Sequence, residues 1–134
     1  SDGVGFLHTI GRMAAGQDDP WINKYIFPGG YLPTLEELMR HAGTEQFVIT
    51  DVENLWQHYA KTLDHWSANY QRHWDAIVAK HGDQFARMWW LYLQGSQAAF
   101  DVGSLQLWQL VMIKNKQTPW PLNREVQLPA HQRA

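Results

Sequence analysis

Two side chains in distant parts of the sequence have the types and positions needed to hold a small anion. His8 stands at the end of an apolar, β-branched segment, and ligands of open α/β sheets bind outside the carboxyl ends of strands. Tyr59 lies near the start of a predicted long helix, where the helix dipole and the free N–H groups favour an anion. A phenol there would complete an anion site with a strand-end histidine. The alternative for His8, a capping side chain bonded to the backbone, stays open.

Four further histidines recur along the predicted helices and raise the question of a metal site: His58, His65, His73 and His81. Their spacing places neighbours about 10–12 Å apart along a helix axis. One metal ion needs ligands about 2 Å from it, which on a helix usually means positions i and i+4. We interpret these histidines as residues of a solvated face and predict no metal site.

Aromatic residues are unusually frequent, with 8 Trp in 134 residues. One stripe of them advances at helical spacing and is interpreted as core rather than as a cofactor site: Tyr59, Trp66, Tyr70 and Trp74. The segment 21–33 is dense with aromatic, apolar and chain-bending residues. It is either a rigid loop with a hydrophobic underside or a loop folded over an apolar ligand, and composition does not choose between them.

Length and composition indicate one folded domain of the usual size. Eleven Lys+Arg against 13 Asp+Glu give a net charge of −2, which argues against a nucleic-acid binder. The absence of Cys excludes a disulfide framework, a thiolate zinc site and a cysteine nucleophile in this sequence. No basic-then-apolar leader opens it, and the weakly charged stretch 88–113 is predicted as a helix and a strand rather than a membrane span.

Three apolar runs predict the strands of one sheet, at residues 4–10, 47–50 and 105–113. The last run is apolar enough to be the central strand. The order is that of an α/β protein, three strands with helices on the faces of the sheet. Because the first strand begins near residue 1, it lacks a neighbour on one side, and such an edge is prone to association. We expect another copy of the chain to cover the Val4–Ile10 edge, with exchanged elements, or the sequence to be part of a larger domain.

Capping residues and glycines set the predicted helix boundaries. Thr34 and Glu37 have the capping-box pattern, which starts a helix that Gly43 ends. Asn54 is predicted to be the N-cap of a long helix that ends at Gly82. The other predicted helical segments are a turn over residues 21–27 and a helix that Asp83 caps and Gly103 closes.

Several strings of this sequence occur in the same order in one family: residues 6–11, 19–33, 51–55, 58–66 and 105–111. On these strings the chain resembles the C-terminal part of a cyclopropane-fatty-acyl-phospholipid synthase, a family that includes the mycolic acid cyclopropane synthases. The resemblance covers residues 1–114 almost completely, and residues 115–134 are predicted to be an extended polar C-terminal tail.

The resemblance implies a fold and a reaction. It implies the C-terminal half of a class I methyltransferase sheet, with S-adenosylmethionine as the methyl donor. The methyl group passes to the double bond of an unsaturated phospholipid acyl chain, a bound bicarbonate takes a proton, and an apolar tunnel excludes water. The implied location is cytoplasmic, with peripheral contact to the inner face of the membrane.

Individual roles also follow from the resemblance. His8, the backbone N–H of Ile10 and the hydroxyl of Tyr59 would contact the bicarbonate, with His8 and Tyr59 as catalytic residues. Five side chains would line the acyl tunnel: Phe27, Leu32, Leu63, Tyr92 and Ser96, the last where many relatives have Cys.

The same family places other essential parts upstream of this region, namely the Gly-rich cofactor turn, the acidic ribose contact, and the Cys and Glu that complete the bicarbonate site. No Gly-x-Gly turn following a strand occurs here. We therefore expect no cofactor-binding residue in this chain, and expect it to be part of a longer enzyme and inactive alone. It would associate with the N-terminal half or form a homo-oligomer. The alternative is a truncated, non-catalytic module that binds lipid or a protein partner.

Overall fold

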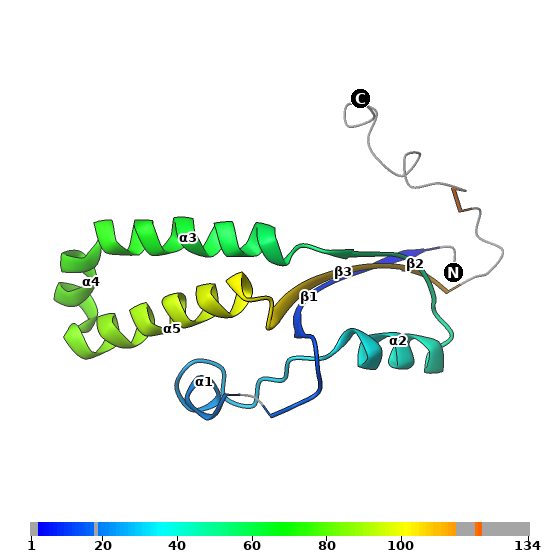
Figure 1. Ribbon diagram of the computed structural model, residues 1–134, viewed down its shortest axis with the longest axis horizontal. Coiled ribbons are helices and arrows are strands. Elements are labelled where there is room, and N and C mark those ends of the chain that lie inside the picture. The colour runs from blue at the N-terminus through cyan, green and yellow to red at the C-terminus, as the bar shows by residue number, and fades with distance from the viewer. Residues whose placement is uncertain (1–2, 18, 115–119, 122–134) are drawn as a thin grey trace.

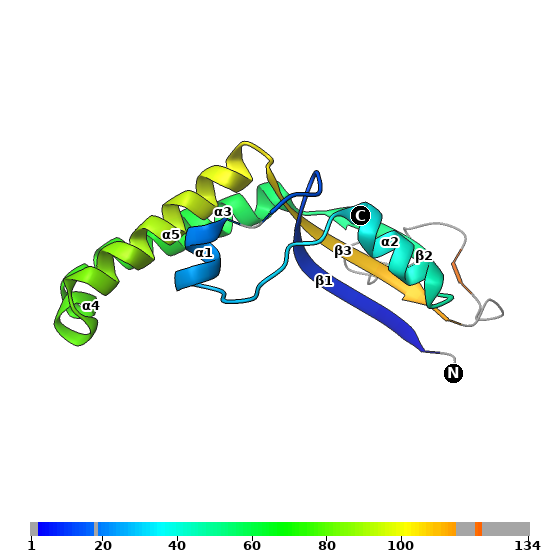
Figure 2. The same ribbon diagram turned by 90° about the horizontal axis from the view of Figure 1, so that it is seen from below.

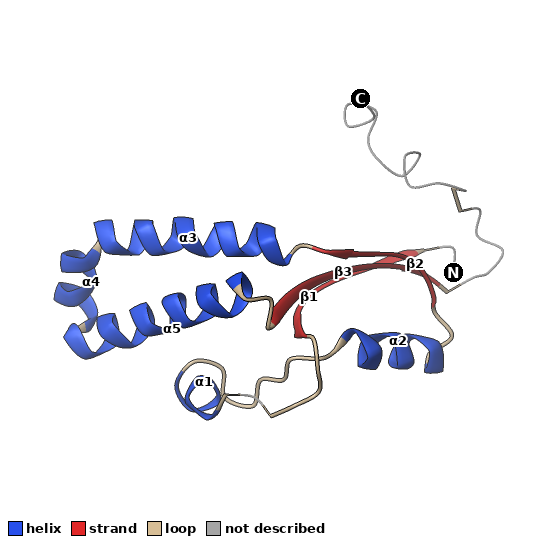
Figure 3. Ribbon diagram, in the orientation of Figure 1, coloured by secondary structure: helices blue, strands red, loops and turns tan. Residues whose placement is uncertain are grey.

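The computed structural model describes residues 3–17, 19–114 and 120–121. These described residues form three strands and five helices, drawn in Figure 1 and coloured by type in Figure 3. In chain order they are β1 (Val4–Arg12), α1 (Pro20–Tyr25), α2 (Leu35–Thr44), β2 (Val48–Asn54), α3 (Trp56–Arg72), α4 (Trp74–His81), α5 (Asp83–Asp101) and β3 (Leu105–Ile113). The predicted tail lies outside the described residues, apart from residues 120–121.

The three strands form one sheet in the order β1-β3-β2, which confirms β3 as the central strand. Both pairings are antiparallel. In the β1–β3 register, His8 lies opposite Gln109 and Ile10 opposite Leu107. β2 is longer than the predicted run 47–50, because pairing with β3 continues to Asn54 after an irregularity between Ile49 and Asp51.

The helices are less evenly distributed over the sheet than predicted. α2 lies along one face, whereas α3, α4 and α5 form a helical hairpin that extends beyond the end of the sheet (Figures 1 and 2). The hairpin meets the sheet through a buried cluster, which we call the junction core: Leu63, Leu93, Phe100 and Leu107. The end of β1, the start of β3, the start of α3 and the end of α5 therefore converge at one place.

Two predicted helix ends are confirmed in atomic detail. The hydroxyl of Thr34 accepts a hydrogen bond from the N–H of Glu37 at 3.2 Å, and the Glu37 carboxylate accepts one from the N–H of Thr34 at 2.8 Å. At the end of α5, Gly103 adopts a φ of 72°. Its N–H donates to the carbonyl of Phe100 and that of Ser104 to Ala99, both at 3.0 Å. This is a Schellman motif, in which glycine is favoured at the left-handed position.

The predicted stop of α2 at Gly43 is wrong, because the helix continues to Thr44. The left-handed residue is Gln46, with a φ of 59°. Its N–H donates to the carbonyl of Gly43 at 3.0 Å, and the N–H of Phe47 donates to that of Ala42 at 2.8 Å. The hydrogen bonds are again those of a Schellman motif, but a glutamine occupies the position that glycine usually takes.

The single long helix predicted from Asn54 to Gly82 is two helices, α3 and α4. They are separated at His73, whose ring nitrogen Nδ1 lies 2.8 Å from the carbonyl oxygen of Asn69. That carbonyl would bond the N–H of residue 73 in an unbroken helix, and the N–H donates to Tyr70 instead. The imidazole thus takes over a backbone hydrogen bond at the break.

Three other predicted helix starts are shifted. Asn54 is the last residue of β2, and Leu55 is the N-cap of α3. Asp83 is the first residue of α5 rather than its cap, and its carboxylate forms an ion pair with Arg87 at 2.7 Å. The turn predicted over 21–27 is α1, which begins one residue earlier because the Asp19 side chain accepts bonds from its first N–H groups.

Gly82 links α4 and α5 in a backbone conformation, φ 85° and ψ 157°, that is essentially restricted to glycine. We expect Gly82→Ala to lower the free energy of unfolding by about 1–3 kcal/mol. Gly95, inside α5, is the matched control, since a Cβ there would meet no atom within 4 Å. Gly95→Ala should raise stability by about 0.5–1 kcal/mol. Urea unfolding of both variants tests this, and equal effects of the two substitutions would contradict it.

Candidate functional site

The side chains of β1 alternate between the two faces of the sheet. Ile10 packs against the junction core, so His8, two residues earlier, points to the same face. Gly11 lies on the other face, where an added Cβ would come within 2.7 Å of Nε1 of the buried Trp108. The side chains of His8 and Ile10 therefore lie on the face of the sheet against which the helical hairpin packs.

His8 is exposed and has a defined polar neighbour. Its Nδ1 lies 2.9 Å from Nε2 of Gln109, the residue opposite it in β3. With the amide donating to Nδ1, the ring proton resides on Nε2, which is then a hydrogen-bond donor. Among the described residues, no group accepts a bond from that nitrogen. The predicted strand-end position is wrong, because β1 continues to Arg12 and His8 is the fifth of its nine residues. The sheet nevertheless orients the ring and leaves one donor available.

The backbone N–H of Ile10 points away from the central strand. The carbonyl of Leu107, opposite Ile10, accepts a bond from the N–H of Leu55 at 2.8 Å and so points toward β2. Consequently the Ile10–Leu107 pair is one of the non-hydrogen-bonded pairs of the ladder. Arg12, which has the same orientation, donates its N–H outward to the carbonyl of Pro33 at 3.0 Å. The N–H of Ile10 lies on that same outer side.

Tyr59 lies on the second turn of α3 and is half-buried at the junction core. Its ring contacts Phe100, with centroids 4.7 Å apart, and Trp66, with centroids 6.0 Å apart. Burial, and secondarily the nearby phenol of Tyr92, raise the pKa of Tyr59, so the hydroxyl stays protonated at neutral pH. Within the described part of the chain the hydroxyl has no hydrogen-bond partner. It is a second unused donor.

Ile10 and Tyr59 share the junction core as neighbours, and His8 lies one step along the same strand face. No hydrogen bond or ring contact joins His8 directly to Tyr59 among the residues that the structure describes. The end of β1 lies beside the start of α3 in both ribbon views (Figures 1 and 2). The structure therefore places Ile10 and Tyr59 at one end of the sheet and His8 in the middle of β1, and a joint function of the three stays a prediction.

An apolar groove of about 540 Å³ runs between α3 and α5. We call it the aromatic groove, and its lining residues are Phe27, Tyr59, Trp66, Asn69, Tyr70, His73, Ile77, Trp89, Tyr92 and Leu93. Phe27 closes over it from the loop after α1, with its ring edge-to-face to Tyr92 at 5.8 Å. Tyr59 connects this groove to the donors at the end of the sheet.

Two of the five predicted tunnel residues, Phe27 and Tyr92, line the aromatic groove. Leu63 is only 1% exposed and belongs to the junction core instead. Leu32 and Ser96 are half-buried outside the lining, and Ser96 is hydrogen-bonded to the phenol of Tyr92. For these three residues a contact with the acyl chain stays a prediction.

Sequence reasoning missed most of the groove. The helical spacing predicts Trp66 and Tyr70 as core residues and does not indicate a site at Trp89 on α5, yet all three line the groove. Trp66 is nevertheless 46% exposed. The signal was present as two aromatic stripes at helical spacing, one on each arm of the hairpin, but a stripe does not reveal whether its partner helix packs tightly or leaves a gap.

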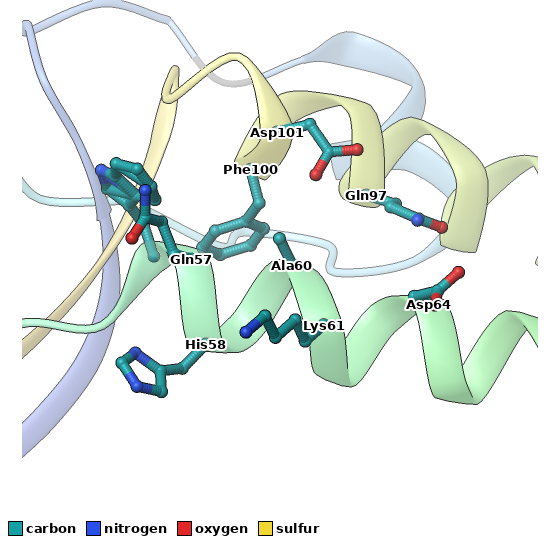
Figure 4. A pocket seen from close by; sticks show the side chains of 9 residues that line it. Gln57, His58, Ala60, Lys61, Asp64, Gln97, Phe100 and Asp101 are labelled. Atoms are coloured by element: carbon teal, nitrogen blue, oxygen red, sulfur yellow. The ribbon is translucent and has the colours of Figure 1, made fainter.

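A second groove, of about 750 Å³, lies between the sheet-proximal parts of α3 and α5 and has a different character (Figure 4). Its lining is largely polar and charged: Trp56, Gln57, His58, Ala60, Lys61, Asp64, Gln97, Phe100 and Asp101. In the described part of the chain, no group of three or more His, Asp or Glu side chains has a geometry that would hold a metal ion.

The buried phenols predict an alkaline limit to stability. Burial raises the pKa values of Tyr59 and Tyr92 above the ordinary value of 10.0. A phenol whose pKa is higher in the folded state contributes its full stability below the unfolded pKa and loses it as pH rises through the folded value. We expect the free energy of unfolding to fall above about pH 10, and Tyr59→Phe to make this fall shallower. Urea unfolding between pH 8 and 11 measures it, and an unchanged slope would count against it.

None of the helices among the described residues is long and apolar enough to cross a bilayer.

Comparisons with known proteins give a consistent picture. The sequence profile of the family described as mycolic acid cyclopropane synthetase matches residues 1–110. Cyclopropane-fatty-acyl-phospholipid synthase of Escherichia coli (strain K12) is 37% identical over 111 residues, which is 82% of this chain and 29% of that protein. Tuberculostearic acid methyltransferase UfaA1 of Mycobacterium tuberculosis is 37% identical over 107 residues, 76% of this chain and 24% of that protein.

Two solved structures share the architecture. Cyclopropane synthase MmaA2 from Mycobacterium tuberculosis is 29% identical and superposes with a TM-score of 0.77 over 83% of this chain and 44% of that one. Mycolic acid cyclopropane synthase CmaA1, complexed with SAH and CTAB, is 31% identical with a TM-score of 0.76, covering 82% and 44%. The chain thus spans less than a third of the length of these curated relatives and less than half of these solved chains.

Proposed function

This chain belongs to the mycolic acid cyclopropane synthetase family, and on that premise we propose that it is the C-terminal part of an S-adenosylmethionine-dependent lipid methyltransferase of the cyclopropane-fatty-acyl-phospholipid synthase type. Its fold is the C-terminal half of a class I methyltransferase sheet. The proposed substrate is an unsaturated acyl chain of a phospholipid. The observation that carries this proposal is the apolar groove that ends at Tyr59, next to the donors of β1.

In this proposal the three donors hold a small, planar anion such as bicarbonate. The protonated phenol of Tyr59 and Nε2 of His8 have no acceptor within the described residues, and the N–H of Ile10 points away from β3. An anion bound there would stabilise positive charge that develops on the acyl chain, and it would accept a proton as a general base. The chain's own task is to hold this base at the inner end of the groove.

The aromatic groove supplies the second requirement, protection from water. Its lining is mainly aromatic and aliphatic, and Phe27 closes over it against Tyr92. A carbocation formed within it would be shielded from attack by water. When bound, S-adenosylmethionine supplies an electrophilic methyl group. In the proposal its site belongs to the N-terminal half of the enzyme, so we expect the purified 134-residue chain to be inactive alone.

A chimaera tests the function directly. This chain would replace the matching segment of the E. coli synthase, with which it shares 37% identity, in a host that lacks its own enzyme. We expect cyclopropane fatty acids in the host lipids, detected by gas chromatography and mass spectrometry, and none when the chain is expressed alone. The unmodified E. coli synthase is the positive control. A folded chimaera that binds S-adenosylmethionine but transfers no methyl or methylene group would refute the proposal.

The aromatic groove also favours a second candidate, a module that binds lipid without chemistry, because ten side chains of this chain line it. That candidate predicts tight binding of a fluorescent fatty acid by the isolated chain together with an inactive chimaera. An active chimaera would exclude it as the main function.

A further inference from the structure

The mouth of the aromatic groove exposes large aromatic surface. Phe27 is 53% exposed and Trp66 is 46% exposed, although both line the groove. They come from different parts of the chain, the loop after α1 and the middle of α3. Transfer of such rings from water to an apolar environment is favourable. Two exposed aromatic side chains at one opening therefore indicate an interaction surface.

We propose that this mouth is the surface by which the protein docks on a lipid bilayer, with Phe27 and Trp66 at the level of the lipid headgroups. The inference rests on the proposed function and adds the location and orientation of the membrane contact. Aromatic rings concentrate at the boundary between headgroups and acyl chains, because one part of the ring system is apolar and Trp also offers a polar N–H. Docked in this way, the groove opens directly into the acyl layer.

The charges around the mouth complement anionic lipid. No Asp or Glu lines the aromatic groove, whereas Asp64 and Asp101 line the second groove on the hairpin. The guanidinium of Arg72 donates to the side chain of Asn69, which is part of the groove lining. Lys24 lies in the last turn of α1, three residues before Phe27. Basic side chains near an apolar surface are attracted to the phosphates of anionic membranes.

The direction of the groove explains why the mouth should touch the bilayer rather than stand away from it. The exposed rings of Phe27 and Trp66 stand directly beside the inner residues, since Trp66 contacts Tyr59 at the junction core. An acyl chain that entered from water would expose every methylene group during transfer, at a cost that increases with chain length. Entry from a bilayer in contact with the mouth avoids that exposure.

The absence of Cys from the sequence permits a direct test. Single cysteines at Phe27→Cys and Trp66→Cys in the full 134-residue chain would carry an environment-sensitive fluorophore. Leu91→Cys is the matched control, since Leu91 is 57% exposed on α5 and does not line the groove. Vesicles of phosphatidylglycerol and phosphatidylethanolamine should increase the fluorescence severalfold and shift it to the blue at positions 27 and 66, but not at 91. Circular dichroism checks that each variant is folded.

Vesicle flotation gives a second, independent measurement. Trp66→Gln should lower the partition coefficient onto the same vesicles by about tenfold, and Leu91→Gln should leave it unchanged. The inference is overturned if labels at 27 and 66 stay in water while the chain is bound. It is equally overturned if position 91 responds as strongly, or if the signals change with protein concentration alone, as contact with a second copy would require.

The experiments distinguish a failure of the docking surface from a failure of the proposed catalytic function. An active chimaera whose Trp66→Gln variant floats with vesicles as well as the parent would overturn the docking surface and leave the function standing. Labels that enter the bilayer alongside an inactive chimaera would support the docking surface and refute the catalytic proposal.

Discussion

Tyr59→Phe in the active chimaera is expected to lower the rate of cyclopropane formation by about 10²–10³-fold, the usual effect of removing one preorganised donor from a charge-stabilising site. The substitution keeps the ring contacts with Phe100 and Trp66 and removes only the hydroxyl, which bonds to none of the described residues. Because the loss concerns the anion and not the groove, kcat should fall while KM for the lipid changes little.

Two further measurements separate this role from a structural one. Raising the bicarbonate concentration should restore part of the activity of Tyr59→Phe, because the weakened site is then filled more completely. The double variant His8→Gln, Tyr59→Phe should be less impaired than the product of the single effects, since both residues hold one ion. Tyr25→Phe, exposed and outside the groove lining, is the control. Full additivity with no bicarbonate response would remove His8 and Tyr59 from a shared site.

The sequence was most informative where a local rule determines the structure. The central position of β3 follows from its predominantly apolar run, which contains no charged residue and is typical of a strand buried on both sides. The Thr34 capping box and the Gly103 helix stop are likewise local, since each depends on hydrogen bonds within a few residues. These features were predicted correctly because no distant contact competes with them.

The errors occur where a side chain substitutes for the expected residue. Gln46 adopts the left-handed conformation that glycine was expected to supply, so the stop of α2 was placed at Gly43. His73 bonds to the carbonyl of Asn69 and interrupts a helix whose hydrophobic periodicity continues without a break. Neither event alters the apolar pattern, and periodicity alone therefore cannot detect it.

The candidate site was only partly predictable for a related reason. His8 and Ile10 lie on one face of β1, as the alternation of a strand requires, but only the family resemblance singled out Ile10. The aromatic groove depends on the separation between α3 and α5, a property of two helices together. A residue such as Trp66 satisfies the helical pattern equally well in a core and at the mouth of a groove.

Leu63 offers the sharpest test of whether a residue belongs to the core or lines the groove. Leu63→Ala is expected to lower the free energy of unfolding by about 2–5 kcal/mol, as truncations in a close-packed core do. Leu63 is 1% exposed and contacts the other members of the junction core, where the hairpin meets the sheet. Loss of this contact loosens the only large interface between the two parts that the structure describes.

The comparison with Leu91→Ala defines the outcome. Leu91 is exposed, so its truncation should change stability by less than about 0.5 kcal/mol. Urea unfolding gives both values, and the distribution of acyl-chain lengths among the products of the chimaera gives the functional comparison.

A core residue should leave that distribution of acyl-chain lengths unaltered at temperatures where the variant is folded. A tunnel residue would instead extend it toward longer or bulkier chains with little loss of stability, because truncation at a groove wall enlarges a space that the substrate fills. Since Leu63 lies beside Tyr59 rather than along the lining, we expect the first result.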